Sequence, residues 1–211
     1  MAGRGAFITL EGGEGAGKTT QLRLLADRLR AAGHDVVTTR EPGGTPAAEQ
    51  IRALLLGEGP WEPVTQALLH FAARREHVAG LIGPALGAGK VVLSDRFADS
   101  TLAYQCFGLG LPRAVWDRLA EVTLDGLRPD LTLVLDLPVP RGLARAAARG
   151  GNNHYEALPE PFHERVRAGF RAIADAEPGR CAVVDADSDA ETVAARIAAV
   201  VAERLPGVLA R

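Results

Sequence analysis

Short apolar runs alternate along this chain with longer segments in which apolar residues recur every three to four positions. The short runs predict buried β-strands over residues 7–10, 36–39, 91–94, 131–137 and 181–184. The longer segments predict helices over residues 18–32, 46–56, 64–86, 112–127, 141–149, 161–176 and 188–204. Strands separated by helices favour an α/β fold, with a doubly wound, five-stranded parallel sheet and flanking helices.

Two predicted helix boundaries carry further information. Ser188, followed three residues later by Glu191, predicts a capping box at the start of the last helix. A polar stretch over residues 150–158, rich in glycine and asparagine, predicts a short mobile lid that spans about 142–160 with its flanks. Arg145 and Arg149 lie just before this stretch, where they could close over transferring phosphates. A solvated basic helix is the alternative.

Composition narrows the class of protein. The 211 residues predict a single domain, 1–211, with a sizeable core. A net charge of −2 gives no support for binding nucleic acid or a membrane surface. Cys106 and Cys181 do not form a disulfide framework, which favours a reducing compartment. Because a strand begins almost at once and no apolar stretch could span a bilayer, we expect a cytoplasmic protein.

Residues 12–19 carry the strongest chemical signal of the chain. They read Gly-Gly-Glu-Gly-Ala-Gly-Lys-Thr between a predicted strand and a predicted helix, which is the phosphate-loop (P-loop) pattern. Glycines let backbone N–H groups approach phosphate oxygens. Lys18 can reach the β and γ phosphates, and the Thr19 hydroxyl can ligate Mg²⁺. The candidate nucleotide-binding residues are Gly12, Gly13, Glu14, Gly15, Ala16, Gly17, Lys18, Thr19 and Thr20.

Charged residues follow the next two predicted strands. Arg40 and Pro42 come after the second strand, where an arginine could face a second anionic group. A Pro-Gly turn with a solvated arginine is the alternative for this segment. Asp95 ends the third strand, in the place of a metal-side carboxylate, and Arg96 follows it. The carboxyl ends of parallel strands share one edge, so we expect these groups near the P-loop.

Other side chains could recognise a nucleobase. His70 and Arg74 are four residues apart, so they share one face of a predicted helix. We expect Phe71 only to pack in the core, and we expect His77 to be a satisfied or solvated histidine. The segment after Arg96 supplies donors, acceptors and a flat ring: Ser100, Thr101, Tyr104 and Gln105. A polar helix start with a core tyrosine is the alternative for that segment.

Together these motifs resemble those of bacterial thymidylate kinases, over nearly the whole chain. The matching segments are Glu11-Gly12-x-Glu14-Gly15-x-Gly17-Lys18-Thr19-Thr20, residues 40–46, residues 95–105 and residues 129–132. The resemblance implies a P-loop NTPase-type fold. It also implies transfer of the γ-phosphoryl group of ATP to dTMP, giving dTDP for dTTP biosynthesis, with Mg²⁺. Family members are usually cytosolic homodimers, so a homodimer is expected.

The resemblance implies roles for the candidate residues. Lys18 and Thr19 would hold the ATP phosphates and Mg²⁺, with Asp95 on the metal side and Arg145 and Arg149 serving ATP and the transition state. The remaining residues would bind dTMP: Glu14 the sugar hydroxyl, Arg40, Pro42 and Arg96 the phosphate, Tyr104 the deoxyribose, and His70, Arg74, Ser100, Thr101 and Gln105 the base. Lys18, Arg96, Arg149 and Glu14 are the expected catalytic residues.

The chain departs from the family pattern at four places. His70 stands where an aromatic residue usually stacks on thymine, and Phe97 and Cys106 replace a usual tyrosine and glycine. In the lid, Asn153-His154 replaces a usual Asp-Arg pair. Another nucleotide or small-molecule kinase on the same fold remains an alternative. A GTP-dependent binding switch is a weaker one, because the chain has no Asn-Lys-x-Asp motif.

Overall fold

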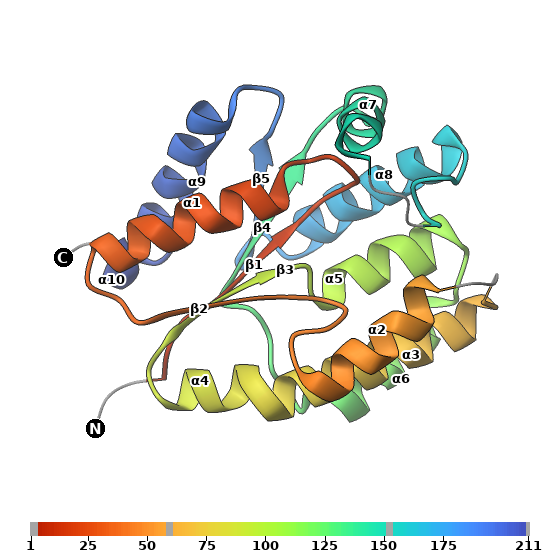
Figure 1. Cartoon of the computed structure of the whole chain (residues 1–211), viewed down its shortest axis with the longest axis horizontal. Coiled ribbons are helices and arrows are strands. Elements are labelled where there is room, and N and C mark those ends of the chain that lie inside the picture. Colours follow the sequence, from red (N-terminus) through yellow and green to blue (C-terminus); the bar gives the residue numbers. More distant parts are fainter. Residues whose placement is uncertain (1–3, 58–60, 151–153, 210–211) are drawn as a thin grey trace.

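The computed structural model describes residues 4–57, 61–150 and 154–209 (Figure 1). Its five strands form one parallel sheet in the order β2-β3-β1-β4-β5. The strands are β1 (Phe7–Glu11), β2 (Val36–Arg40), β3 (Val91–Asp95), β4 (Leu131–Asp136) and β5 (Cys181–Asp185). The predicted α/β fold with a five-stranded parallel sheet is therefore confirmed, and the predicted strands agree with these bounds to within one residue.

Helices cover both faces of the sheet. The described helices are α1 (Lys18–Ala31), α2 (Pro46–Leu56), α3 (Pro63–His77), η1 (Val78–Ile82), α4 (Gly83–Gly87), α5 (Ala98–Thr101), η2 (Leu102–Gly108), α6 (Arg113–Leu124), α7 (Val139–Arg149), α8 (Glu160–Ala176), α9 (Ala190–Arg204) and α10 (Pro206–Leu209). In Figure 1, α1 and α9 lie on one side of the sheet, and α2 to α6 lie on the other. This arrangement buries the three central strands, β1, β3 and β4, on both faces, as their apolar runs predict, whereas the edge strands β2 and β5 keep exposed positions.

Alternating residues of the central strand divide the core between the two faces. Ile8 and Leu10 pack with Leu25 of α1 and Ile197 of α9. Phe7 faces the opposite way and packs against η1, α4 and Phe97 at 5.0 Å between ring centroids. The two-residue period of a strand explains this division, because successive side chains point to opposite faces.

Three helical details differ from the sequence prediction. The predicted helix 64–86 contains a π-helical turn, η1, between α3 and α4. A helical segment over residues 98–108 was not among the predicted helices, because its polar residues mask its period. The predicted Ser188 cap is wrong: Asp189 is the N-cap of α9, and its side chain accepts from the backbone N–H of Thr192. Asp189 has the extended backbone and short acceptor that a cap requires, one residue later in the chain.

The register of the sheet brings the candidate motifs together. Leu10 of β1 pairs with Asp95 of β3, and Arg40 of β2 pairs with the same Asp95. The sheet order places β1 between β3 and β4, so the connections from β1 and from β4 leave toward opposite sides. Ligands of doubly wound folds bind at such a point, beyond the carboxyl ends of the strands.

Candidate active site

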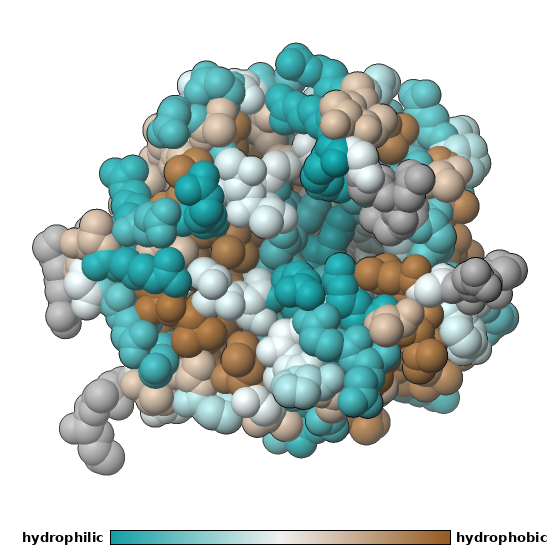
Figure 2. Space-filling model, in the orientation of Figure 1, coloured by the Kyte–Doolittle hydropathy of each residue, from teal (hydrophilic) through white to brown (hydrophobic). Residues whose placement is uncertain are grey.

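A cavity of about 600 Å³ opens at the carboxyl ends of the strands. Figure 2 shows hydrophilic residues gathered around a hollow on this face of the molecule. All the site residues predicted from the sequence line this cavity, apart from Gly12, Gly13 and Arg145. The volume lies within the range of small-molecule and cofactor sites, which is about 300–1,000 Å³. The structure therefore gathers residues from distant motifs into one space large enough for nucleotide groups.

The P-loop backbone adopts conformations that glycine allows. Gly12, Gly15 and Gly17 have positive φ values of 136°, 66° and 90°. A side chain at Gly15 would also collide with the carbonyl oxygen of Gly142 in α7. Gly17 is the N-cap of α1 and provides no side-chain cap, so the first N–H groups of α1 have no partner from the cap residue. This is the geometry that binds an anion at a helix N-terminus.

Lys18, the first residue of α1, is buried against this loop. Its Nζ donates to the carbonyl oxygens of Gly12 at 3.1 Å and Gly13 at 2.8 Å. Burial and the nearby Arg96 lower the pKa of Lys18 to about 8, although neighbouring carboxylates oppose the shift. Lys18 is therefore a cation held close to its own backbone at neutral pH, in a position to exchange carbonyl oxygens for phosphate oxygens.

Thr19 and Asp95 form a pair of oxygen ligands beside Lys18. The Thr19 hydroxyl donates to Asp95 Oδ2 at 2.6 Å, and both residues line the cavity. Mg²⁺ in nucleotide sites is held by one or two protein oxygens, together with phosphate oxygens and water. The donor set fits that ion. The described residues contain no cluster of three or more histidine, cysteine or acidic side chains that would indicate a different, fully protein-bound metal.

Arg96 connects the P-loop to the acceptor side of the cavity. Its guanidinium donates to Glu14 Oε1 at 3.1 Å, the Tyr104 hydroxyl at 3.0 Å and Ser100 Oγ at 3.1 Å. Although burial disfavours its charge, nearby Tyr104, Glu14 and Asp95 raise the pKa of Arg96 further, so the guanidinium stays charged. The backbone of Arg96 has φ 72°, a left-handed conformation that costs energy for a residue with a side chain.

Glu14 is ionised in this arrangement. It is largely buried, which disfavours its charge, but Arg96, Lys18 and the Tyr104 hydroxyl together lower the pKa of Glu14 below its usual range. The Tyr104 hydroxyl donates to Glu14 Oε1 at 2.7 Å. The carboxylate therefore fixes both Tyr104 and Arg96, and it still lines the cavity.

Arg74 also lines the cavity and lies in a buried polar cluster. Its Nε donates to Glu41 Oε2 at 2.7 Å, and its Nη2 donates to Thr101 Oγ1 and to the carbonyl oxygen of Phe97, each at 3.0 Å. His77 holds the other oxygen of Glu41 at 2.9 Å, so it is a satisfied core histidine as expected. Nη1 of Arg74 is buried and has no partner among the described residues. A buried donor without a partner needs an acceptor, which a bound ligand could supply.

The remaining arginines differ in orientation. Arg149, at the end of α7, lines the cavity and pairs with Glu156 at 3.0 Å. Arg145 points elsewhere: its closest acceptors are the carbonyl oxygens of Ala186 and Ser188, each at 3.5 Å. Arg40 lines the cavity and pairs with Glu49 at 3.0 Å. Asn153 of the predicted lid lies outside the described residues.

Comparisons with known proteins agree with this geometry. A family model described as thymidylate kinase matches residues 10–197. The chain belongs to the thymidylate kinase family. It is 55% identical to the thymidylate kinase of Caulobacter vibrioides, covering 96% of this chain and 98% of that relative. The enzyme of Gluconobacter oxydans is 54% identical, covering 97% and 98%.

A solved structure shows the same fold. The crystal structure of thymidylate kinase from Ehrlichia chaffeensis superposes with a TM-score of 0.77 and 35% identity, covering 94% of this chain and 99% of that chain. The chain is therefore a kinase with the family's function, the phosphorylation of dTMP. The family uses ATP as phosphoryl donor together with Mg²⁺. Every helix in the described part of the chain is too short or too polar to cross a bilayer.

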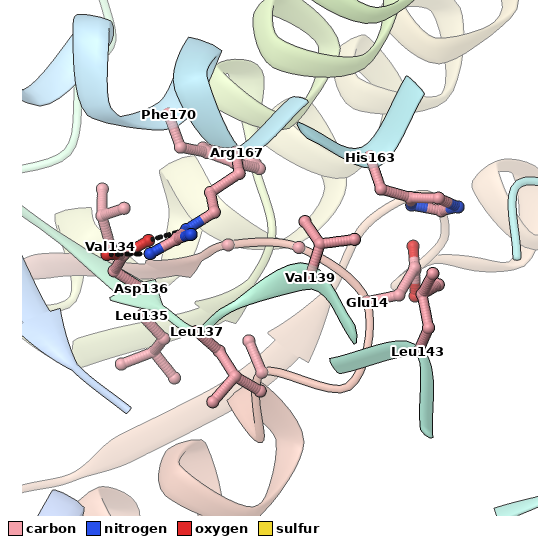
Figure 3. A pocket seen from close by; sticks show the side chains of 13 residues that line it. Glu14, Val134, Leu135, Asp136, Leu137, Val139, Leu143, His163, Arg167 and Phe170 are labelled. Carbon is pink, nitrogen blue, oxygen red and sulfur yellow. Dashed lines mark hydrogen bonds and ion pairs between the residues drawn. The ribbon is translucent and has the colours of Figure 1, made fainter. Parts of the chain in front are cut away.

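A second, smaller space lies behind the P-loop of this thymidylate kinase family member (Figure 3). It is lined by Gly12 and Gly13, and its volume of about 20 Å³ suits roughly one water molecule. At one end Arg167 donates to both oxygens of Asp136, at 2.7 and 3.0 Å; Glu14 and His163 lie at the other. Arg167 is therefore a structural partner of β4, and the space holds no substrate-sized group.

Sequence reasoning missed several residues at this site. Arg52 and Leu56 line the cavity without having been singled out, and Glu11 and Tyr155 make the most informative contacts. Glu11 appeared only as part of a motif, but its buried carboxylate accepts from Ser100 Oγ and, at 2.7 Å, from the backbone N–H of Phe97. Burial, followed by the charge of Asp99, raises the pKa of Glu11 to about 8. The sequence signal that could have identified Glu11 is an acidic residue at the end of an apolar strand. Tyr155 also lines the cavity, and no spacing pattern pointed to it.

Proposed function

We propose that this chain transfers the γ-phosphoryl group of ATP to dTMP within the 600 Å³ cavity, with ATP at the P-loop end and dTMP at the Arg74 end. One observation carries the orientation. A phosphate-binding loop with Lys18 and a buried arginine, Arg74, whose Nη1 has no partner among the described residues, line the same cavity. The proposal treats residues 1–211 as a single kinase domain whose lid lies at about 142–160.

On the ATP side, the P-loop backbone and Lys18 would bind the β and γ phosphates. Thr19 and Asp95 would hold Mg²⁺, which neutralises phosphate charge when bound. Arg149 would contribute the lid cation, because it already lines the cavity. The sequence also predicts that Arg145 binds ATP. Its guanidinium faces the carbonyl oxygens of Ala186 and Ser188, which supports a smaller role for it than for Arg149.

On the dTMP side, Arg40 and Arg96 would bind the acceptor phosphate, with Pro42 beside it. Glu14 and Tyr104 would contact the sugar; their mutual hydrogen bond of 2.7 Å holds the ring against the cavity wall. The base would lie at the end formed by His70, Arg74, Ser100, Thr101 and Gln105. Arg74 Nη1 would donate to a carbonyl oxygen of the base, which satisfies a buried donor that otherwise has no partner.

The chemistry requires placement and charge stabilisation rather than a covalent intermediate. An oxygen of the dTMP phosphate attacks the γ-phosphorus of ATP, and the bond from that phosphorus to the bridging oxygen of ADP breaks. No enzyme nucleophile takes part, and the acceptor phosphate is already ionised near neutral pH. Lys18, Arg96 and Arg149 would stabilise charge on the transferring group.

The proposal extends to compartment and assembly. Cys106 and Cys181 are both free thiols, which supports the cytoplasm as a reducing environment. Leu54 of α2, Leu68 of α3 and Val122 of α6 are 55%, 50% and 79% exposed. Since α3 packs against both α2 and α6, these apolar side chains support a homodimer through that face. Light scattering on a gel-filtration column measures the mass directly, and a monomer at micromolar concentration would refute this part.

A coupled assay tests the reaction. Purified enzyme is given ATP and Mg²⁺ with dTMP, dUMP, UMP, CMP or AMP, and ADP formation is followed. We expect the highest kcat/KM with dTMP. Preference for AMP, CMP or UMP would overturn the substrate assignment, whereas nucleotide binding without phosphoryl transfer to any acceptor would favour the binding-switch alternative.

A further inference from the structure

The hydroxyl of Tyr155 lies at the base end of the cavity, although Tyr155 belongs to the connection between α7 and α8. Among the residues that the structure describes, it contacts three side chains from other elements. Its oxygen lies 3.0 Å from Gln66 Oε1, 2.9 Å from Gln105 Nε2 and 3.3 Å from His70 Nε2. Gln66 and His70 are on α3, and Gln105 is on η2. One hydroxyl therefore links the lid connection to both helices at this end.

The hydrogen-bond partners determine where each proton lies. Gln66 Nε2 donates to the carbonyl oxygen of Trp61 at 3.0 Å, which sets the orientation of the Gln66 amide. Gln66 Oε1 is therefore an acceptor, and it receives the Tyr155 proton. Burial raises the pKa of Tyr155 to about 12, so the hydroxyl keeps that proton. The Tyr155 oxygen must then accept from its two other neighbours, Gln105 and His70.

This arrangement leaves one tautomer for His70. Its Nε2 carries the proton that is donated to Tyr155, and Nδ1 is left as an unprotonated acceptor. A second proton is disfavoured: burial, followed by the charge of Arg74, Arg96 and other cations, lowers the pKa of His70 to about 3. The ring that replaces the family's usual stacking aromatic is thus neutral and hydrogen-bonded at one edge.

We propose that Tyr155 is a positioning residue for base recognition, whose hydroxyl holds the His70 ring in one tautomer and one orientation against a pyrimidine nucleotide base. The proposal rests on the function proposed above, because it takes the Arg74 end as the base site. A phenyl ring stacks in the same way after a half-turn, whereas an imidazole presents different edges. Replacing the aromatic by histidine therefore creates a need for an external group that sets the ring.

The test compares Tyr155→Phe in two backgrounds. Phenylalanine keeps the ring that packs edge-on to Tyr104 at 5.3 Å and parallel to Phe162 at 6.4 Å, so only the hydroxyl is lost. In the wild-type background we expect KM for dTMP to rise about 3- to 10-fold, with kcat and KM for ATP unchanged, because the hydroxyl that orders His70 and Gln105 in the base site is removed. In the His70→Phe background, the same change is expected to raise KM for dTMP clearly less, because only the contacts with Gln105 and Gln66 are then lost.

A spectroscopic measurement reads the tautomer without activity. Nitrogen-15 NMR of histidine-labelled enzyme, with the His70 signals assigned by their loss in His70→Phe, is expected to show protonated Nε2 in the wild type and a tautomer mixture in Tyr155→Phe. Equal KM changes in both backgrounds, or protonated Nδ1 in the wild type, would overturn the inference. If the wild type does not phosphorylate dTMP, the proposed function fails, and the NMR result alone then decides whether Tyr155 sets the tautomer.

Discussion

Lys18 is expected to reduce the stability of the fold while it serves catalysis, and replacing it with methionine separates these effects. The pKa of Lys18 falls from 10.5 to about 8, because its ammonium is buried and faces Arg96. A shift of this size opposes folding by about 3 kcal/mol at neutral pH. Methionine has similar length and no charge. It also loses the two hydrogen bonds to Gly12 and Gly13, so we expect a net gain of about 1–3 kcal/mol in the free energy of unfolding.

The pKa of Lys18 in the folded and unfolded states determines how the stability difference between Lys18→Met and wild type changes with pH. Below about pH 8, Lys18 is charged in the folded and unfolded states, so wild type carries the full cost of burying the ammonium. Between pH 8 and pH 10.5 the unfolded state alone keeps the proton, and wild-type stability rises relative to the variant. The stability difference between Lys18→Met and wild type should therefore be largest below pH 8 and close as pH approaches 10.5.

Thermal unfolding at pH 7, 8, 9 and 10 measures this difference, at about 2–4 °C of Tm for each kcal/mol. Lys90 is the other lysine of the chain; its side chain is 37% exposed and pairs with Asp35 at 2.9 Å, which makes Lys90→Met a matched control that should not gain stability. The kcat of Lys18→Met should fall about 100-fold or more. A Lys18→Met enzyme that is less stable than wild type at pH 7, by an amount independent of pH, would refute the reasoning.

Three further predictions concern Arg149, Tyr104 and Arg180. Arg149→Ala should lower kcat about 10³-fold with little change in KM for dTMP, because a lid cation acts as charge develops; unchanged turnover in steady-state assays would remove it from the mechanism. Tyr104→Ala should narrow the kcat/KM ratio between dTMP and its ribose analogue, and an unchanged ratio would leave Tyr104 with packing alone. Arg180 donates to both oxygens of buried Asp99, at 2.6 and 2.9 Å, so Arg180→Ala should destabilise the fold by about 3 kcal/mol in urea unfolding. The control is Arg128→Ala, whose side chain is 74% exposed and which should change stability by less than about 1 kcal/mol.

The sequence by itself determined the succession of the strands and of most helices along the chain, and the presence of the P-loop. These features depend on neighbours within a few positions: an apolar run predicts a buried strand, and the spacing from Gly12 to Lys18 sets the loop that binds phosphate. The sequence also predicted that the Arg40, Asp95 and P-loop motifs would meet, because parallel strands align their carboxyl ends. The sequence could not locate the cap of α9 to the residue, because Ser188 and Asp189 are both residue types that cap helices.

Only the tertiary structure decided how individual side chains point and what surrounds them. The sequence assigned both Arg145 and Arg149 to ATP, yet their places on α7 direct one toward backbone carbonyls and the other into the cavity. Tyr155 and His70 are 85 residues apart, and their contact depends on how the lid connection packs against α3. The lowered pKa of Lys18 likewise depends on burial and on Arg96, which come from distant segments. Local patterns specify the elements, whereas orientation and electrostatic environment arise from packing between residues that the sequence keeps far apart.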